Sequence, residues 1–350
     1  MTSLLRGALA ALVLTSAVSL AAAPATASDA GTCGSASGDA AIAACTRAIE
    51  SGEYSGHKLA ALFNNRCSEW NGKRNSDKAL ADCNEAIRLE PGYALAYFNR
   101  GNAFFAKGQF DAAIAEYDQS IRLNPKYANA FSNRGNTYGN KGQWDRAIAD
   151  YNEALRLNPK HATALYNRGT AYNATHQPDR AIADFDLTIR LAPNDPDAFY
   201  NRGIAYKAKG QLDKAIADYD QTIRLAPNYG NAFNNRGNVY NAKGQFDRAI
   251  EDFNQALRIN PRHTEALNNR GGAYNNKGEF DRAIADLDQA IRTNPKYALA
   301  FYNRGYAWER KNDLQRALAD YQAFAALAPS DPDASKCVER VTKAMGGSAK

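Results

Sequence analysis

Cysteine carries the most reactive side chain in this 350-residue chain, and four of its five copies lie near the N-terminus. Cys33, Cys45, Cys67 and Cys83 indicate two disulfides if the chain folds in an oxidising compartment. Of the three pairings that four cysteines allow, we favour Cys33 with Cys45 and Cys67 with Cys83. A metal site is the weaker interpretation, because the chain has no C-x-x-C pair. Cys337 is left over; we expect a partly buried free thiol, with intermolecular pairing as the alternative.

No other set of residues predicts catalysis. The sequence contains no Gly-rich phosphate loop, H-E-x-x-H, G-x-S-x-G or EF-hand loop. Its four histidines, at 57, 161, 176 and 263, are scattered along the chain. We therefore expect a protein that is not an enzyme and that has no metal and no cofactor.

The N-terminus predicts export. Residues 1–27 have the pattern of a secretory signal peptide, with Arg6 before an apolar run at 7–23 and a cleavage site after Ala27. A retained anchor is less favoured, because the run is Ala-rich and is broken by Pro24, whereas a spanning helix needs about 20 strongly apolar residues. We expect a bacterial periplasmic or secreted protein with no membrane span after cleavage.

Composition excludes two further classes. Hydrophobic residues make up 45% and charged residues 23% of the chain, which argues against wholesale disorder. The formal charge of +6 is mild and dispersed. Nucleic-acid binding requires basic residues gathered on one face, so we expect no nucleic-acid partner.

The sequence that surrounds these residues repeats every 34 residues. Proline recurs at this spacing from 91 to 329, and Asn-Arg-Gly recurs in phase from 99 to 303. The repeats are 60–93, 94–127, 128–161, 162–195, 196–229, 230–263, 264–297 and 298–331. Positions within each repeat are numbered 1 to 34 below.

Each repeat predicts two helices. Aromatic or Leu residues at positions 4 and 11 lie on one stripe of a first helix. A second helix is expected to begin at an acidic N-cap such as Asp111, and Gly108 and its equivalents at position 15 are expected to end the first helix in the left-handed conformation. His176 takes that place in one repeat. Gly at position 8 is expected to face Ala at position 20, which allows close helix approach.

This period and pattern resemble the tetratricopeptide repeat family. The resemblance implies an all-α, right-handed superhelical α-solenoid of helix-turn-helix repeats. Residues 28–59 are expected to form an N-terminal half repeat that carries cysteines. Residues 332–350 are expected to form a C-terminal capping helix and tail.

Charged positions predict a structural ladder. Position 7 is Arg and position 23 is an acid in all eight repeats. We expect these residues to pair between the two helices of a repeat. As exposed pairs they would contribute only about 0 to 1 kcal/mol each.

The same resemblance implies that the first helices line a concave surface that meets ligands. Position 6 is Asn in every repeat, and further Asn and Tyr residues lie nearby. Carboxamides both donate and accept, so a row of them could pair with the backbone of an extended peptide. The alternative is that position 6 ties neighbouring helices together. The predicted groove residues are Asn99, Asn133, Asn167, Asn201, Asn231, Asn234, Asn235, Asn238, Asn241, Asn269, Asn303, Tyr166, Tyr200 and Tyr302.

These observations predict a non-catalytic scaffold or adaptor that binds an extended segment of another protein in the Asn/Tyr-lined groove. The residues that a carboxylate clamp for chaperone tails would need are missing, since position 6 is never Arg. The alternatives are a module that binds a cell-envelope glycan or peptidoglycan, and a self-assembling scaffold.

Overall fold

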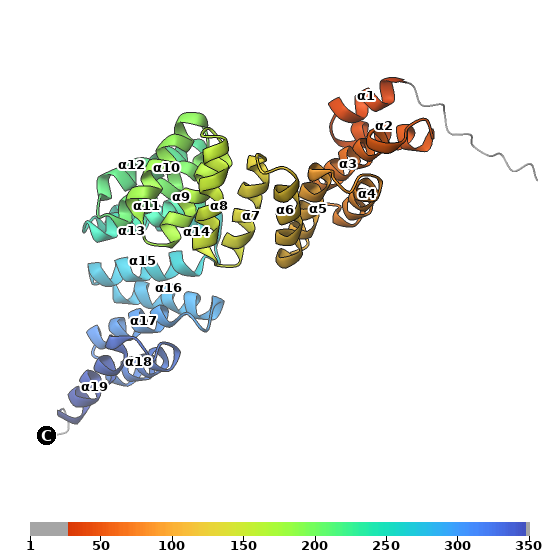
Figure 1. Ribbon diagram of the computed structural model, residues 1–350. Coiled ribbons are helices and arrows are strands. Elements are labelled where there is room, and N and C mark those ends of the chain that lie inside the picture. Colours follow the sequence, from red (N-terminus) through yellow and green to blue (C-terminus); the bar gives the residue numbers. More distant parts are fainter. Residues whose placement is uncertain (1–26, 348–350) are drawn as a thin grey trace, which may run out of the picture. The chain divides into compact units, whose positions relative to one another are not determined.

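The structure is a computed structural model that describes residues 27–347 of the chain. The predicted signal peptide lies outside the described residues except for Ala27. Within the described part every element is an α-helix, 19 in all, and no strand occurs (Figure 1). The predicted all-α class is confirmed.

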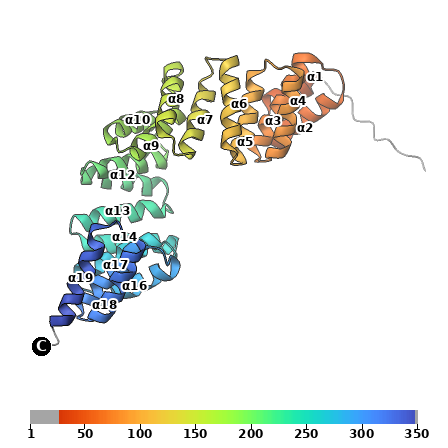
Figure 2. The ribbon, with the colours of Figure 1, turned by 60° about the horizontal axis from the view of Figure 1, so that its bottom comes forward.

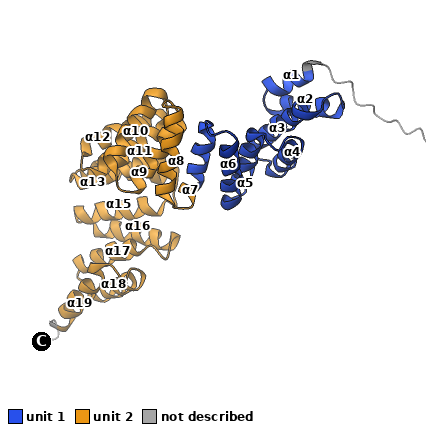
Figure 3. Ribbon diagram, viewed as in Figure 1, with its two compact units in different colours: residues 1–137 blue, residues 138–350 orange. Residues whose placement is uncertain are grey.

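The chain divides into two compact units, residues 1–137 and 138–350 (Figure 3). The helices that begin in unit 1 are α1 (Ala27–Ser35), α2 (Gly38–Glu50), α3 (Gly56–Gly72), α4 (Ser76–Leu89), α5 (Ala94–Ala106), α6 (Phe110–Leu123) and α7 (Ala128–Asn140).

Unit 2 continues the alternation of first and second helices. Helices α15 to α18 follow one another side by side (Figure 1), and α12 lies beside α13 (Figure 2). Its helices are α8 (Trp144–Leu157), α9 (Ala162–Ala174), α10 (Pro178–Leu191), α11 (Pro196–Ala208), α12 (Leu212–Leu225), α13 (Gly230–Ala242), α14 (Phe246–Ile259), α15 (Thr264–Lys277), α16 (Phe280–Thr293), α17 (Ala298–Arg310), α18 (Leu314–Leu327) and α19 (Pro332–Gly347).

The turn between the two helices of a repeat confirms one expectation and corrects another. Position 15 has a positive φ in all eight repeats, for example 72° at Gly108 and 57° at His176. The expected acidic N-cap is wrong. The N-cap of α6 is Gln109, and Asp111 lies in the first helical turn instead. A carboxylate in the first turn still interacts favourably with the helix dipole. An acidic residue therefore indicates that a helix begins nearby but does not identify its N-cap residue.

The close contact between paired helices also differs from expectation. A Cβ built on the position-8 glycine would first meet the side chain at position 24, not Ala at position 20. On Gly101 it would lie 2.6 Å from Tyr117, and on Gly203 it would lie 2.7 Å from Tyr219. The glycine at position 8 therefore makes room for the buried side chain at position 24, which packs between the two helices of the pair.

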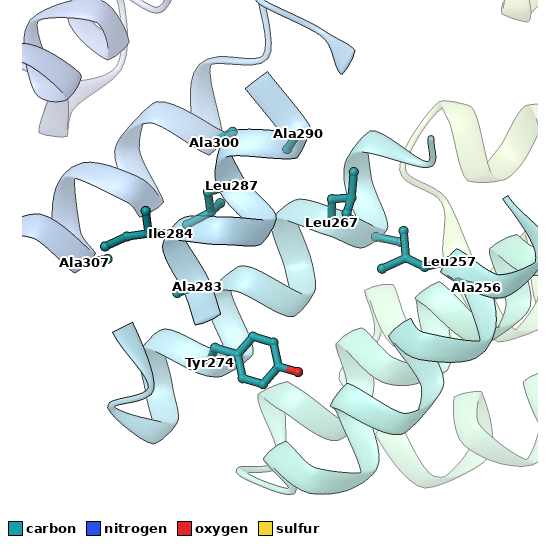
Figure 4. Packing of buried hydrophobic residues seen from close by; sticks show 11 residues of the cluster. Ala256, Leu257, Leu267, Tyr274, Ala283, Ile284, Leu287, Ala290, Ala300 and Ala307 are labelled. Atoms are coloured by element: carbon teal, nitrogen blue, oxygen red, sulfur yellow. The ribbon is translucent and has the colours of Figure 1, made fainter. Parts of the chain in front are cut away.

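Buried side chains join one pair to the next. Figure 4 shows Leu267 and Tyr274 of α15 in one cluster with Leu287 of α16 and Ala300 of α17. Leu287 is fully buried, and it takes the place that an aromatic ring has in most other repeats. Each pair thus buries part of its apolar surface only against its neighbours, as expected of a repeat array.

The N-terminal helices are linked by sulfur. The structure joins Cys33 of α1 to Cys45 of α2, and Cys67 of α3 to Cys83 of α4. Cys67 and Cys83 occupy positions 8 and 24, where later repeats place glycine and, in all but one of them, an aromatic ring. Helix α1 was not predicted, since only α2 resembles half of a repeat. Cys337 is buried in α19 against α18 and has no disulfide.

Candidate functional site

The position-6 asparagines mostly connect neighbouring first helices. Within unit 2, the Nδ2 of four of these asparagines donates to the position-5 residue of the preceding first helix, at distances of 2.9 to 3.0 Å. The four bonds are Asn201 to Tyr166, Asn235 to Tyr200, Asn269 to Asn234 and Asn303 to Asn268.

Unit 1 uses the same donor. Asn99 donates to Asn64 at 2.9 Å, and both are buried. Phe98 at position 5 of the next repeat cannot accept, and there Asn133 donates to Asn102 at 2.8 Å. The alternative raised for position 6, that it ties neighbouring helices together, therefore describes these bonds well.

The predicted groove tyrosines are also engaged. The ring of Tyr166 packs on the cluster that contains Phe185, and Tyr200 packs on the cluster that contains Tyr219. Burial raises the pKa of Tyr166 and of Tyr200, so both hydroxyls accept their Asn bond as neutral groups. Tyr302 packs within 5.2 Å of Phe324, between ring centroids.

The remaining predicted residues differ in environment. Asn231 is exposed, and its Oδ1 lies 3.0 Å from Nε2 of His263. The Oδ1 of Asn241 accepts a bond from Asn276 at 3.1 Å. Asn167 and Asn238 are half-buried on α9 and α13.

A second set of asparagines lies at position 12, to which the predicted groove residue Asn241 also belongs. Asn275 donates its Nδ2 to the backbone oxygen of Asn303 at 2.8 Å, and Asn173 and Asn71 make the equivalent bonds to Asn201 and Asn99 in the first helix of the next repeat. The Oδ1 atoms of Asn275 and Asn71 are buried without a hydrogen-bond partner. Leaving a buried acceptor unsatisfied costs about 1–3 kcal/mol.

Several of these residues meet in a hollow of about 420 Å³ on the first helices α13, α15 and α17. No side chain with a formal charge lines it. Its walls are six carboxamides, two tyrosines and one glycine: Asn241, Asn268, Asn269, Gly272, Asn275, Asn276, Tyr302, Asn303 and Tyr306. This hollow, called the amide hollow below, is the candidate site.

Sequence reasoning placed Asn241, Asn269, Asn303 and Tyr302 in the groove, and the hollow brings them together. It missed Gly272 and Tyr306. The signal that could have found Gly272 is its position, since position 9 carries a larger residue in every other first helix from α5 to α17.

The charged residues form the predicted ladder. Arg236 bonds both oxygens of Asp252 at 2.6 and 2.8 Å, and equivalent two-bond pairs occur in six other repeats. Arg236 also bonds Asp220 of the preceding repeat. Pairing within the repeat is confirmed for these seven repeats, but the expectation of exposed pairs is wrong, because the side chain of Asp252 is only 5% exposed.

The ladder is electrostatically tight. Burial raises the pKa of Asp252, and the bonds from Arg236 oppose that rise. Burial alone would lower the pKa of Arg236, yet its bonds to Asp252 and Asp220 raise it. These arginines are therefore committed to the fold, and they leave no free basic stripe along this face.

Two further features bear on the class of protein. Among residues 29–346 no group of three or more His, Cys, Asp and Glu side chains could hold a metal ion. None of the described helices combines the length and apolarity needed to cross a membrane.

Helix pairs that recur along the chain and pack against their neighbours define an α-solenoid repeat protein. Models of the TPR repeat and the tetratricopeptide repeat match residues 101–142, 133–196, 196–229, 230–263 and 272–342. The chain therefore belongs to the tetratricopeptide repeat family, whose members are in general non-catalytic scaffolds for protein interactions.

Solved structures agree with this fold. A tetratricopeptide repeat protein from Parabacteroides merdae is 22% identical, with a TM-score of 0.55 over 71% of this chain and 98% of that one. The Cut9–Hcn1 hetero-tetramer of the APC/C is 18% identical over 76% of this chain and 52% of that one, with a TM-score of 0.60. This chain thus spans about half of that protein.

YrrB, described as a TPR protein with an unusual peptide-binding site, is 28% identical over 53% of this chain and 95% of that one, with a TM-score of 0.48. A comparison with curated proteins gave no match.

Proposed function

We propose that this protein is an exported scaffold that captures an extended segment of a partner protein on the first helices α13, α15 and α17. The observation that supports this proposal is the amide hollow, where six carboxamides and two tyrosines converge. Carboxamides offer donors and acceptors together, which suits the alternating N–H and C=O groups of an extended backbone.

The proposed compartment is the bacterial periplasm or the cell exterior. It rests on the signal-peptide pattern of residues 1–27 and on the two cysteine pairs in α1 to α4. Disulfides persist in such compartments and are rare in the cytosol. Thiol labelling of the chain, isolated from cells and then denatured because Cys337 is buried in the fold, tests this, with one free thiol expected per chain.

The glycan alternative is weaker at this hollow. Sugar binding by tyrosine uses a free ring face, but Tyr302 packs on Phe324 and Tyr321, and Tyr306 has the guanidinium of Arg310 near its ring. Binding of the purified chain to protein-free peptidoglycan would restore that alternative.

The direct test fills the hollow. A Cβ built on Gly272 meets no atom within 4 Å, and its φ is not in the left-handed range, so Gly272→Leu should fold normally. We expect the proteins captured from the native envelope by the wild-type chain to be lost with this variant.

The matched control is Gly31→Leu. Gly31 is also helical, also has open space around an added Cβ and lies on α1. It should capture the same partners as the wild type. Equal capture by both variants and the wild type would contradict the proposed site.

A further inference from the structure

Exposed apolar side chains gather at the ends of the second helices. Among the described residues, seven large hydrophobic side chains are exposed, and five of them lie in the last two turns of a second helix. These five are Leu123, Leu187, Leu191, Ile259 and Leu327. A single exposed hydrophobic residue is ordinary on a protein surface, but this concentration at one place in the repeat requires an explanation.

In unit 2 the same helix ends carry arginine. Positions 26, 29 and 30 share one face of a second helix, because residues three and four apart are neighbours, and position 33 lies in the turn that follows. In the repeats 162–195, 196–229 and 230–263 these positions hold four arginines and no acid. The residues are Leu187, Arg190, Leu191, Asn194, Gln221, Arg224, Leu225, Asn228, Gln255, Arg258, Ile259 and Arg262. They are called the basic edge below.

The arginines of the basic edge are exposed, and within the described part of the chain none of them bonds a carboxylate. Arg258 bonds the neutral amide of Gln255. The carboxylates closest in sequence are used elsewhere, since Asp220 is held by Arg236 and Asp195 caps α11. The positive charge of the edge is therefore not balanced by the fold.

The opposite ends of the same helices differ. At the start of α14, Asp247 pairs with Lys277 of the next repeat at 2.6 Å, and the guanidinium of Arg248 lies 4.4 Å from the ring centroid of Tyr240. None of the seven exposed hydrophobic side chains lies at that end. Exposed aliphatic groups and unbalanced cations thus occur together only at the end of the second helix.

A hollow of about 410 Å³ opens on the basic edge between two consecutive repeats. Arg258, Ile259 and Gln255 of α14 line it, together with Pro227 and Asn228 of the preceding turn. A guanidinium and two carboxamides can donate to a phosphate ester, and no carboxylate is present to repel it. The aliphatic side chains beside them suit the carbon atoms that such an ester carries.

We propose that the basic edge docks on the surface of an anionic phospholipid bilayer. Its arginines attract the phosphate headgroups, while Leu187, Leu191 and Ile259 enter the boundary between headgroups and acyl chains. A soluble polyanion would use the arginines and leave these aliphatic side chains in water. A protein partner would need them gathered in one desolvated pocket, whereas they are spaced over three repeats.

This docking is independent of the capture of a protein segment. The basic edge lies on the second helices α10, α12 and α14 and on the turns after them, whereas the amide hollow lies on first helices. One chain can therefore rest on a membrane and keep its candidate site open.

The test is cosedimentation of the mature chain, residues 28–350, with vesicles in 0.1 M NaCl. Vesicles of equal parts phosphatidylglycerol and phosphatidylcholine should bind the chain at least tenfold more tightly than vesicles of phosphatidylcholine alone. Arg190→Gln combined with Arg258→Gln should weaken binding to the anionic vesicles about thirtyfold, because each cation at such a surface contributes to the attraction.

The matched control removes the same charge from the other ends of the same two helices. Arg180→Gln combined with Arg248→Gln should change binding less than about threefold, although the net charge of the chain falls equally. Equal weakening by the two double variants, or equal binding of the wild type to both kinds of vesicle, would overturn the proposal.

A second variant separates a bilayer from a soluble polyanion. Leu191→Ser combined with Ile259→Ser keeps every arginine and should weaken binding to the anionic vesicles about tenfold, through the loss of apolar surface that enters the bilayer. Undiminished binding would rule out the bilayer as the occupant. If Ile259→Ser lowers the thermal unfolding midpoint, Leu187→Ser combined with Leu191→Ser on α10 gives the same test.

Discussion

Helices α11 and α15 have the same place in their repeats and present different surfaces. At positions 5, 9 and 12, α11 carries Tyr200, Ile204 and Lys207, whereas α15 carries Asn268, Gly272 and Asn275. Both helices receive the same bond at position 5 from the asparagine at position 6 of the next first helix. The bond that joins the repeats is therefore independent of the surface built around it.

The size of the acceptor makes the difference. Tyr200 reaches its partner with a ring that packs on Tyr219 and Tyr229, so the space in front of α11 is occupied by the protein itself. Asn268 reaches its partner with a short side chain, and Gly272 adds no bulk beside it. A repeat can thus change from a packed to a hollow surface without losing its junction.

The largest expected effect is the loss of that packing on α11. Tyr200→Asn combined with Ile204→Gly should lower the free energy of unfolding by about 3–5 kcal/mol, from the lost ring contacts and a glycine in mid-helix. Urea denaturation followed by circular dichroism measures it. Asn268→Ala with Gly272→Ala on α15 is the matched change. A loss as large there would break the comparison.

The Arg–Asp pairs of the ladder should contribute similarly to the free energy of unfolding in different repeats. Arg236 bonds Asp252 and Asp220, and Arg304 bonds Asp320 and Asp288. Arg236→Met and Arg304→Met each leave a buried carboxylate unpaired, so each should cost about 3 kcal/mol. An unchanged denaturation midpoint in either variant would mean that the ladder contributes nothing to stability.

Converting α15 toward α11 should affect binding more than stability. Asn268→Tyr keeps an acceptor for Asn303 and places a ring in the hollow. We expect about a tenfold loss in the amount of partner protein captured from the native envelope and a change in unfolding free energy below about 1 kcal/mol. Lys296→Tyr, in the exposed turn before α17, serves as the control for an added ring. Undiminished capture would remove the hollow from the binding surface.

The smallest expected effect concerns the cap of α9. Nδ1 of His161 accepts from the N–H of Ala164 at 3.3 Å, and burial lowers the pKa of His161. The folded state therefore favours neutral His161, and the stability this gives is present above the unfolded pKa of about 6.5 and is lost as the pH falls below it.

His161→Asn keeps a capping side chain but does not titrate. Between pH 7.5 and pH 5.5 the wild type should lose more stability than this variant, by a small amount because solvent screens the half-exposed ring. Identical losses in urea titrations at the two pH values would show that protonation of His161 does not matter to the fold.

The fold was predictable because its signals are local and repeated. Proline and Asn-Arg-Gly at a 34-residue spacing predict the helix pairs. The residues equivalent to Arg236 and Asp252 occur at the same offset in every repeat. The N-cap prediction failed because Asp111 stabilises the first turn as well as it would a cap, so composition alone does not place it. The glycine partner failed because both position 20 and position 24 face the first helix.

The site was less predictable because it depends on contacts between repeats. In the sequence, Asn269 and Asn303 cannot be distinguished from side chains that are free to bind a ligand, but each donates one N–H to the preceding first helix. The unpartnered oxygen of Asn275 exists only because the Asn303 backbone fixes the other end of the same amide. No spacing within a single helix contains that information.

The Cys67–Cys83 bond has a consequence for protein engineering. It spans 16 residues and joins positions 8 and 24, the two positions at which Gly203 seats Tyr219 and Gly237 seats Phe253. A disulfide and a packed aromatic ring can therefore join the two helices of a pair at the same two positions. Any later helix pair provides a ready template for a designed cross-link, and the disulfide could be moved along the array one repeat at a time.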